Sequence, residues 1–209
     1  DGTSSTVTVN ILGTNDAAVI STATANLTEA NAILTASGTL TVSDVDSSAT
    51  FTSGTITGTH GSLTIDAAGS WTYTASSAHD EFAAGTTYSD VFTVTSADGT
   101  TSTVTVNILG TNDAAVISTA TANLTETNAV LTASGTLTVS DVDSPATFTA
   151  ATIAGTYGSL TIDAAGNWGY TASSAHDEFA AGTTYSDVFT VTSADGTTST
   201  VTVNILGTN

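Results

Sequence analysis

Apolar and polar residues alternate along many short stretches of this chain. In Thr103–Leu109, for example, Val104, Val106 and Ile108 fall on one face, and the residues between them are threonine or asparagine. A period of two is typical of half-buried β-strands, because successive side chains of a strand point to opposite faces. Short segments rich in glycine, aspartate and alanine separate these stretches, and Lys, Arg and Met are absent. The pattern therefore predicts an all-β fold of short antiparallel strands.

Seven strands are predicted in the first full copy of the pattern. They span residues 17–28, 33–43, 49–57, 62–66, 70–75, 87–96 and 101–109. Seven short strands in roughly 100 residues, with turn signals at regular spacing, predict an immunoglobulin-like β-sandwich.

Two aromatic positions and one acidic position stand out within these strands. Trp71 and Tyr73 alternate with polar residues, so we expect them in the core rather than on a sugar-stacking surface. Asp90 has the same parity as the apolar Phe92 and Val94. A β-bulge or a position at the rim of the sheet is therefore predicted at Asp90.

The whole pattern occurs twice. Residues 16–112 and 113–209 are copies of one 97-residue unit that differ at nine positions. These positions are 30/127, 33/130, 48/145, 53/150, 54/151, 57/154, 60/157, 70/167 and 72/169. Residues 1–15 closely match the end of the unit, 98–112, and are predicted to be the last strand of a preceding repeat. The predicted domains are thus 1–15, 16–112 and 113–209 of a longer array, which supplies length or multivalency rather than catalysis at one point.

The charge balance restricts the possible partners. The chain has no Lys or Arg against 19 Asp and Glu residues, and its formal net charge is −19. No side chain can neutralise phosphate, which argues against nucleic acid as a partner, and an anionic membrane surface would repel the chain. Neither a disulfide nor a membrane-inserted helix is expected, because Cys is absent and no apolar run approaches about 18 residues. The carboxylates must face water, repel one another or bind a cation.

The acidic residues are predicted to gather at the ends of each domain. If consecutive strands run in opposite directions, every loop is assigned to one end. One end of the first copy carries Asn15, Asp16, Asp44, Asp46 and Asp98, and the other carries Glu29, Asp80 and Glu81. If the copies stack, this second end meets Asn112, Asp113, Asp141, Asp143 and Asp195 of the next copy, whose own far end carries Glu126, Asp177 and Glu178.

Such a gathering of carboxylates predicts Ca²⁺ sites. Like charges are costly at close range, and Ca²⁺ relieves this cost by taking six to eight oxygen ligands. Asp141 and Asp143 are two residues apart, so in extended backbone their carboxylates lie on the same side, about 7 Å apart. His is scarce and Cys and Met are absent, which favours Ca²⁺ over zinc or copper as the bound metal. All 16 residues named for the domain ends are predicted metal ligands; the alternative is a solvated surface that keeps the protein soluble.

Other candidate chemistry is weak. His79, Asp80 and Glu81 have no identifiable nucleophile beside them, and a polar loop end next to a calcium site is the preferred interpretation. His60 is replaced by Tyr157 in the second copy, which argues against a required role. No enzymatic activity is predicted.

The motifs, taken in order, resemble a known family. They are GTNDA at 110–114, Thr-Glu at 28–29, Asp-Val-Asp at 44–46, an Asp-x-x-Gly turn before Trp71, and ADGT at 97–100. This set resembles the VCBS-type and related immunoglobulin-like, cadherin-like repeats of large bacterial RTX adhesins. Its linker, with Glu upstream and Asp-x-Asp downstream, is similar to the cadherin junction that Ca²⁺ rigidifies. One departure is Ala115, where the family commonly has Pro.

The resemblance implies a function outside the cell. It implies tandem cadherin-like β-sandwiches, type I secretion, a location at the bacterial cell surface and Ca²⁺ as the cofactor. The array would then be an extender whose partners are its own neighbouring repeats, and it would project a terminal adhesive domain for surface attachment or biofilm formation. A surface glycan or protein would be bound through other domains. The alternative is that the repeats themselves bind carbohydrates or proteins, through the variable face around residues 53–60.

Overall fold

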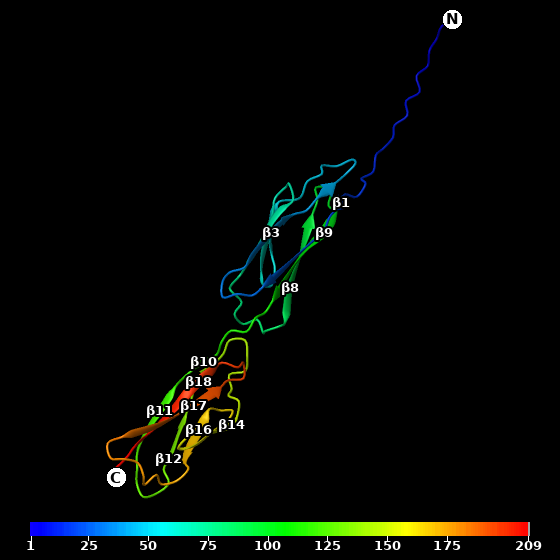
Figure 1. Ribbon diagram of the computed structural model, residues 1–209. Coiled ribbons are helices and arrows are strands. Elements are labelled where there is room, and N and C mark those ends of the chain that lie inside the picture. Colours follow the sequence, from blue (N-terminus) through cyan, green and yellow to red (C-terminus); the bar gives the residue numbers. More distant parts are fainter. Residues whose placement is uncertain (209) are drawn as a thin grey trace. The chain divides into compact units, whose positions relative to one another are not determined.

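The computed structural model describes residues 1–208 and divides into two compact units. The first unit comprises Asp1–His79 and Gly85–Gly110, and the second comprises Asp80–Ala84 and Thr111–Asn209. Each unit is built from β-strands and loops (Figure 1). None of the described residues belongs to a helix long and apolar enough to cross a membrane.

The same strands recur in both units. The first unit contains β1 (Val19–Ile20), β2 (Ala23–Thr28), β3 (Thr35–Thr39), β4 (Val42–Ser43), β5 (Gly54–Thr57), β6 (Gly61–Ile65), β7 (Ser70–Ala75), β8 (Thr87–Thr95) and β9 (Thr101–Leu109). The second unit contains β10 (Val116–Ile117), β11 (Ala120–Thr125), β12 (Thr132–Thr136), β13 (Val139–Ser140), β14 (Ala151–Ala154), β15 (Gly158–Ile162), β16 (Asn167–Ala172), β17 (Thr184–Thr192) and β18 (Thr198–Leu206).

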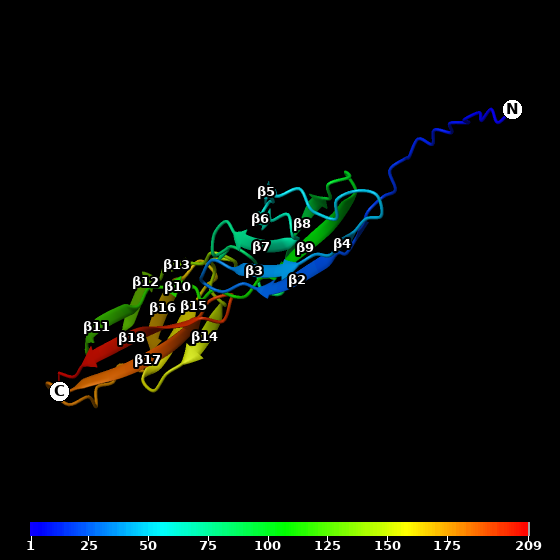
Figure 2. The same cartoon turned by 90° about the horizontal axis from the view of Figure 1, so that it is seen from above.

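Two sheets form each sandwich. In the first unit a three-stranded sheet has the order β2-β9-β8, a four-stranded sheet has the order β3-β7-β6-β5, and β1 pairs with β4. The second unit repeats this arrangement with β11-β18-β17, β12-β16-β15-β14 and β10-β13, and Figure 2 shows its strands in two layers. The pairs β2-β9 and β11-β18 are parallel, and the other pairs are antiparallel. The predicted all-β sandwich fold is confirmed, but the prediction that all strands are antiparallel is wrong for β2-β9 and β11-β18.

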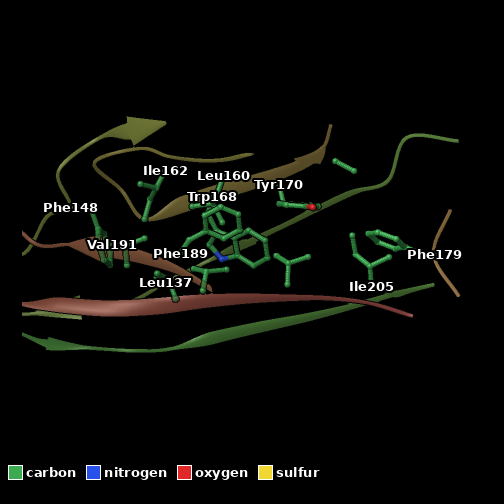
Figure 3. Close-up of a cluster of buried hydrophobic side chains, with 13 residues drawn as sticks. Leu137, Phe148, Leu160, Ile162, Trp168, Tyr170, Phe179, Phe189, Val191 and Ile205 are labelled. Atoms are coloured by element: carbon green, nitrogen blue, oxygen red, sulfur yellow. The ribbon is translucent and has the colours of Figure 1, made fainter. Parts of the chain in front are cut away.

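The core lies between the two sheets and follows from the alternation. In the second unit, Trp168 and Tyr170 of β16 and Phe189 of β17 are at most 6% exposed (Figure 3). Gly135 of β12 makes room for the indole, because a Cβ there would lie 2.7 Å from the Trp168 ring. Trp71, at 5% exposed, and its neighbour Tyr73, at 0%, are equally buried in the first unit, which confirms the core prediction.

Two of the predicted strands are interrupted. The strand predicted over 17–28 breaks after β1 because the Ser21 amide donates to the Thr41 carbonyl, at 3.0 Å, and the Thr41 amide donates to Ser21 Oγ, at 2.9 Å. Beyond this break the chain leaves β4 and pairs with β9 as β2. The strand predicted over 33–43 divides likewise, because β3 pairs with β7 and β4 pairs with β1.

The other strand predictions differ less from the structure. The prediction for 49–57 is too long, because β5 covers only Gly54–Thr57 and Phe51 makes a single bridge to Ser96. The strands predicted over 62–66, 70–75, 87–96 and 101–109 match β6 to β9 within one residue. The bulge predicted at Asp90 is wrong, since β8 pairs regularly with β9 through the Asp90–Val106 pair, whereas the alternative of a position at the rim fits the place of β8 at the edge of its sheet.

Residues 1–15 form no strand in the structure. Their apolar residues Val7, Val9 and Ile11 are 84%, 75% and 90% exposed. The equivalent residues of β9, Val104, Val106 and Ile108, are at most 1% exposed, so the same residues suit a strand when a sheet is present. That this segment completes a preceding repeat stays a prediction.

Candidate metal sites at the domain ends

The loop between β4 and β5 positions two predicted ligands at one end of the first unit. Asp44 Oδ1 accepts the backbone N–H groups of Asp46, at 2.9 Å, and Ser47, at 2.8 Å. A short aspartate side chain commonly closes a turn in this way. These N–H groups lower the pKa of Asp44. The Asp-Val-Asp motif therefore folds on itself and keeps Asp44 ionised.

The turn between β8 and β9 supplies a third carboxylate at the same end. Asp98 accepts hydrogen bonds from the hydroxyls of Ser96 and Thr100 and from the backbone N–H of Ala18, the last at 3.0 Å. The hydroxyl groups of Ser96 and Thr100, together with backbone N–H groups, hold the pKa of Asp98 far below its usual range. Asp98 thus joins the start of the domain to the turn and carries a full negative charge at neutral pH.

The linker residues complete this group. Asn15 Oδ1 accepts a hydrogen bond from Ser47 Oγ at 2.9 Å, and the Asp16 backbone N–H donates to Asp46 Oδ2 at 3.2 Å. The structure therefore brings five predicted ligands together at this end. We term them the N-terminal acidic set: Asn15, Asp16, Asp44, Asp46 and Asp98. The second unit has the equivalent set of Asn112, Asp113, Asp141, Asp143 and Asp195, with corresponding bonds.

Several oxygen atoms of these sets lack hydrogen-bond donors. Within residues 1–208, Asp44 Oδ2 and its counterpart Asp141 Oδ2 are buried without a hydrogen bond, as are Asp113 Oδ2 and Asp143 Oδ2. Burial, together with the neighbouring carboxyl of Asp141, raises the pKa of Asp143. The atoms available as metal ligands are all oxygens, and those without a hydrogen bond belong to carboxylates. This chemistry fits a hard divalent cation such as Ca²⁺.

A buried glutamate marks the opposite end of each unit. Glu126 directly follows β11, its backbone N–H donates to the Leu206 carbonyl at 2.8 Å, and its side chain is 2% exposed. Its Oε2 accepts the Thr208 hydroxyl, whereas Oε1 has no hydrogen-bond partner within residues 1–208. Glu29 follows β2 in the same way and is 3% exposed. The Thr-Glu motif thus places a carboxylate inside the end of the sandwich.

The remaining predicted ligands lie in the loop before β8 or β17. Asp80 is partly buried, and Glu81, Asp177 and Glu178 are exposed. Glu178 Oε1 lies 3.0 Å from His176 Nδ1, and this contact lowers the pKa of Glu178. Glu178 is therefore engaged by a histidine of its own loop.

This histidine was not expected in the interior. His176 is 6% exposed, its φ angle is 61°, and its ring stacks on Phe179 with the centroids 4.4 Å apart. Nε2 lies 2.8 Å from the Tyr157 carbonyl. Although burial opposes protonation, the contacts with Glu178 and this carbonyl raise the pKa of His176. The prediction of a polar loop end is wrong for the histidine itself, and the aromatic residue three positions later is the signal that could have shown it.

Sequence reasoning also missed the role of Asp90. This carboxylate is 4% exposed and accepts the backbone N–H groups of Thr59, at 2.7 Å, and His60, at 3.0 Å. A Cβ at Gly58 would lie 2.6 Å from it, so glycine is needed there. Burial and the nearby charge of Asp90 raise the pKa of Tyr73 to about 12. Asp90 closes the β5-β6 turn from inside, and its parity with Phe92 was the available signal.

Comparison with known proteins identifies the family. The profile of the bacterial cadherin-like domain matches residues 15–110 and again residues 112–207. Cadherin domains 3–6 of protocadherin gammaB7 resemble the chain with a TM-score of 0.50 at 14% identity, covering 91% of this chain and 48% of that one. Cadherin domains 3–6 of protocadherin gamma B2 give 0.50 at 11% identity, covering 92% and 52%.

These similarities are to parts of longer proteins. The chain spans about half the length of the two protocadherin structures, and at such low identity the likeness shows the fold alone. No curated protein matches the chain. The family match covers nearly all of it, and the chain belongs to the bacterial cadherin-like domain family, of which it carries two tandem copies.

Proposed function

We propose that these repeats are extender domains of a secreted bacterial adhesin and that Ca²⁺ bound at the domain ends stiffens the array. Cadherin-like repeats are generally extracellular adhesion or extender modules. The proposal adds the RTX adhesin context, type I secretion, a position at the cell surface and a role in attachment or biofilm formation. The resemblance of the repeat motifs to VCBS-type extender repeats supports these additions.

One observation carries the calcium proposal. Each unit gathers an N-terminal acidic set whose carboxylates include buried oxygens without a hydrogen bond within residues 1–208. Two like charges 4 Å apart repel by about 4 kcal/mol at an effective dielectric constant of 20. The chain has no Lys or Arg to offset this repulsion. A divalent cation is the simplest partner for such a set.

We propose domain limits at 16–112 and 113–209, with residues 1–15 as the last strand of a preceding repeat. Each proposed site then includes residues from two consecutive domains. In this arrangement the acidic set of one domain binds Ca²⁺ together with the glutamate end of the domain before it. The proposed ligands of the inner junction are Asn112, Asp113, Asp141, Asp143, Asp195, Glu29, Asp80 and Glu81. Glu126, Asp177 and Glu178 would serve a following repeat.

Calcium would then couple folding to the location of the protein. Calcium sites of extracellular modules bind with dissociation constants of roughly 0.1–1 mM. Such sites fill outside the cell and remain empty in the cytosol. The array would be flexible while it is being exported and stiff once it is outside.

The test is a calcium titration by calorimetry, combined with small-angle scattering in Ca²⁺ and in chelator. We expect millimolar or tighter binding and a larger maximum dimension with Ca²⁺. The double variant Asp141→Asn with Asp143→Asn should lose binding at the inner junction while both domains stay folded. Asp163→Asn is the matched control, because Asp163 closes the β15-β16 turn through backbone N–H groups that an asparagine oxygen also accepts. Equal dimensions in Ca²⁺ and chelator would contradict the proposal.

The alternative, direct binding of carbohydrates or proteins by the repeats, has less support. It predicts an exposed aromatic patch on each unit. Trp71 and Tyr73, the aromatic residues of β7, lie in the core instead.

A further inference from the structure

Each unit carries one acceptor sequence for N-linked sugars. Asn26, Leu27 and Thr28 form the pattern Asn-X-Thr, and the second unit repeats it at 123–125. In this pattern the asparagine amide nitrogen is the atom that receives the sugar. Asn26 and Thr28 are exposed and Leu27 is half-buried, so the two residues of the acceptor pattern lie on the outer face of β2.

The hydrogen bonds of this face leave the amide nitrogen of Asn26 available. Asn26 Oδ1 accepts Asn107 Nδ2 at 2.8 Å, and Asn107 Oδ1 accepts Ser89 Oγ at 2.7 Å. This chain fixes the side-chain oxygen of Asn26 toward β9 and leaves its Nδ2 on the opposite side. By contrast, the Nδ2 atoms of Asn107, Asn112 and Asn167 all donate to neighbouring residues. The second unit has the same chain through Asn123, at 2.8 and 2.7 Å.

The surface beside Asn26 has room for a sugar. A hollow of about 360 Å³ is lined by Asn26, Leu27, Thr28, Thr87, Asn107 and Leu109. Leu109 is 39% exposed and is flanked in the sheet by Thr28 and Thr87. An apolar floor with polar neighbours suits a sugar ring, which presents C–H faces and hydroxyl edges. Because the amide nitrogen of Asn26 faces away from β9, a first sugar attached there extends from the outer face of β2 without displacing any core residue.

We propose that Asn26 and Asn123 are N-glycosylation sites that are modified before β2 and β11 join their sheets. The amide nitrogen attacks C1 of an activated sugar, the N–C1 bond forms and the C1–O bond to the donor phosphate breaks. The amide proton leaves with the phosphate, and nothing is oxidised or reduced. The donor is a nucleotide sugar or a lipid-linked sugar diphosphate.

Modification before folding follows from the position of the acceptor in a strand. In the sheet, Asn26 is paired with Asn107, and the asparagine and the threonine two residues later are held about 7 Å apart. A transferase must bring both side chains to one active site, which an unpaired chain permits. The inference is independent of the calcium proposal, because none of these residues belongs to the acidic sets.

The test is mass spectrometry of the protein purified from the cells that produce it. Chymotrypsin is the suitable protease, because a chain without Lys or Arg has no trypsin site. We expect sugar on the peptides that contain Asn26 and Asn123. A single hexose would identify a nucleotide-sugar donor, and a longer oligosaccharide a lipid-linked one. Unmodified Asn26 and Asn123 in the secreted protein would overturn the proposal.

Variants separate the acceptor pattern from other effects. Asn26→Gln and Asn123→Gln should each remove one sugar chain, and Thr28→Ala should remove the chain on Asn26 whereas Thr28→Ser retains it. Asn107→Gln is the matched control: it alters the neighbouring amide on the same face and should leave the modification unchanged. Persistence of the sugar on Asn26 in Thr28→Ala would overturn the assignment to this acceptor pattern.

Discussion

The carboxylate of the buried Asp90 and those of the N-terminal acidic set are bound in two different ways. Each oxygen of the Asp90 carboxylate accepts a backbone N–H, from Thr59 and His60. In the acidic set, Asp44 Oδ2 is buried and has no hydrogen bond within residues 1–208. The chain has no Lys or Arg to offer to either. The first carboxylate is thus satisfied by the fold itself, and the second retains the capacity to bind a cation.

The second unit shows which part of the Asp90 arrangement matters. Its counterpart Asp187 accepts the backbone N–H groups of Thr156 and Tyr157 at 2.7 and 2.9 Å. Tyr157 stands where the first unit has His60. The side chain can change because the backbone N–H of this position, which histidine and tyrosine both provide, binds the carboxylate.

The largest expected effect is the loss of the buried carboxylate. Asp90→Ala leaves the backbone N–H groups of Thr59 and His60 without acceptors, and we expect the unfolding free energy to fall by about 3 kcal/mol or more. The loss should be equal in Ca²⁺ and in chelator, as measured by urea unfolding. Val91→Ala, at an exposed position of the same strand, should change stability by less than about 0.5 kcal/mol. Recovery of the lost stability in Ca²⁺ would show that Asp90, like the acidic set, depends on the cation.

Calcium should stabilise the acidic set and leave Asp90 unaffected. At 100 times the dissociation constant, one site adds about 2.7 kcal/mol to the unfolding free energy. The double variant Asp44→Asn with Asp46→Asn should lose this gain in differential scanning calorimetry. In chelator the same variant should lose only a little stability, because an asparagine oxygen at position 44 can still accept the backbone N–H groups of residues 46 and 47. Equal destabilisation with and without Ca²⁺ would mean that these aspartates act structurally.

Acid should act on the set through Asp98. Its pKa is lowered in the folded state, so its contribution is fully present above the unfolded pKa of about 3.9 and is lost as the pH falls through the lower folded value. Asp98→Asn should therefore flatten the decline of the melting temperature below about pH 4. The measurement is thermal unfolding across this range in chelator. An unchanged slope would show that other carboxylates govern acid unfolding.

The smallest expected effect concerns the exposed contact between Ser47 and Asn15. Ser47→Ala removes the hydroxyl that donates to Asn15 Oδ1, and we expect a cost of about 0.5 kcal/mol in chelator. Because Asn15 Oδ1 is then free to face a cation, calcium affinity should not fall. A large loss of affinity in a calorimetric titration would show that the hydroxyl orients the set.

The strands with one buried face were predictable from sequence. Residues 103–108 alternate without interruption, and β9 has the predicted limits of 101–109. The division of the first strand into β1 and β2 was not predictable, because it depends on which strand each half pairs with, β4 or β9. The Asp90 role was missed for a related reason: the N–H groups that satisfy it come from a turn about thirty residues earlier in the chain.

The acidic set could be anticipated because alternating strand directions place the loops of Asp44 and Asp98 at one end. The rule uses only the order of the strands and needs no side-chain detail. It could not show that Glu178 contacts His176, because this contact depends on the unusual backbone angle of a single loop residue. Loop conformation, rather than strand order, limited the prediction of the other end.

The parallel pairing of β2 with β9 has a mechanical consequence. The chain enters the sandwich shortly before β2 and leaves it after β9, and the two strands run side by side from the Ala23–Val104 pair to the Thr28–Leu109 pair. Tension between the two ends of a domain therefore loads these backbone hydrogen bonds in shear, all at once, instead of opening them one after another. A domain with this strand pairing therefore resists pulling best along the line that joins its two chain ends.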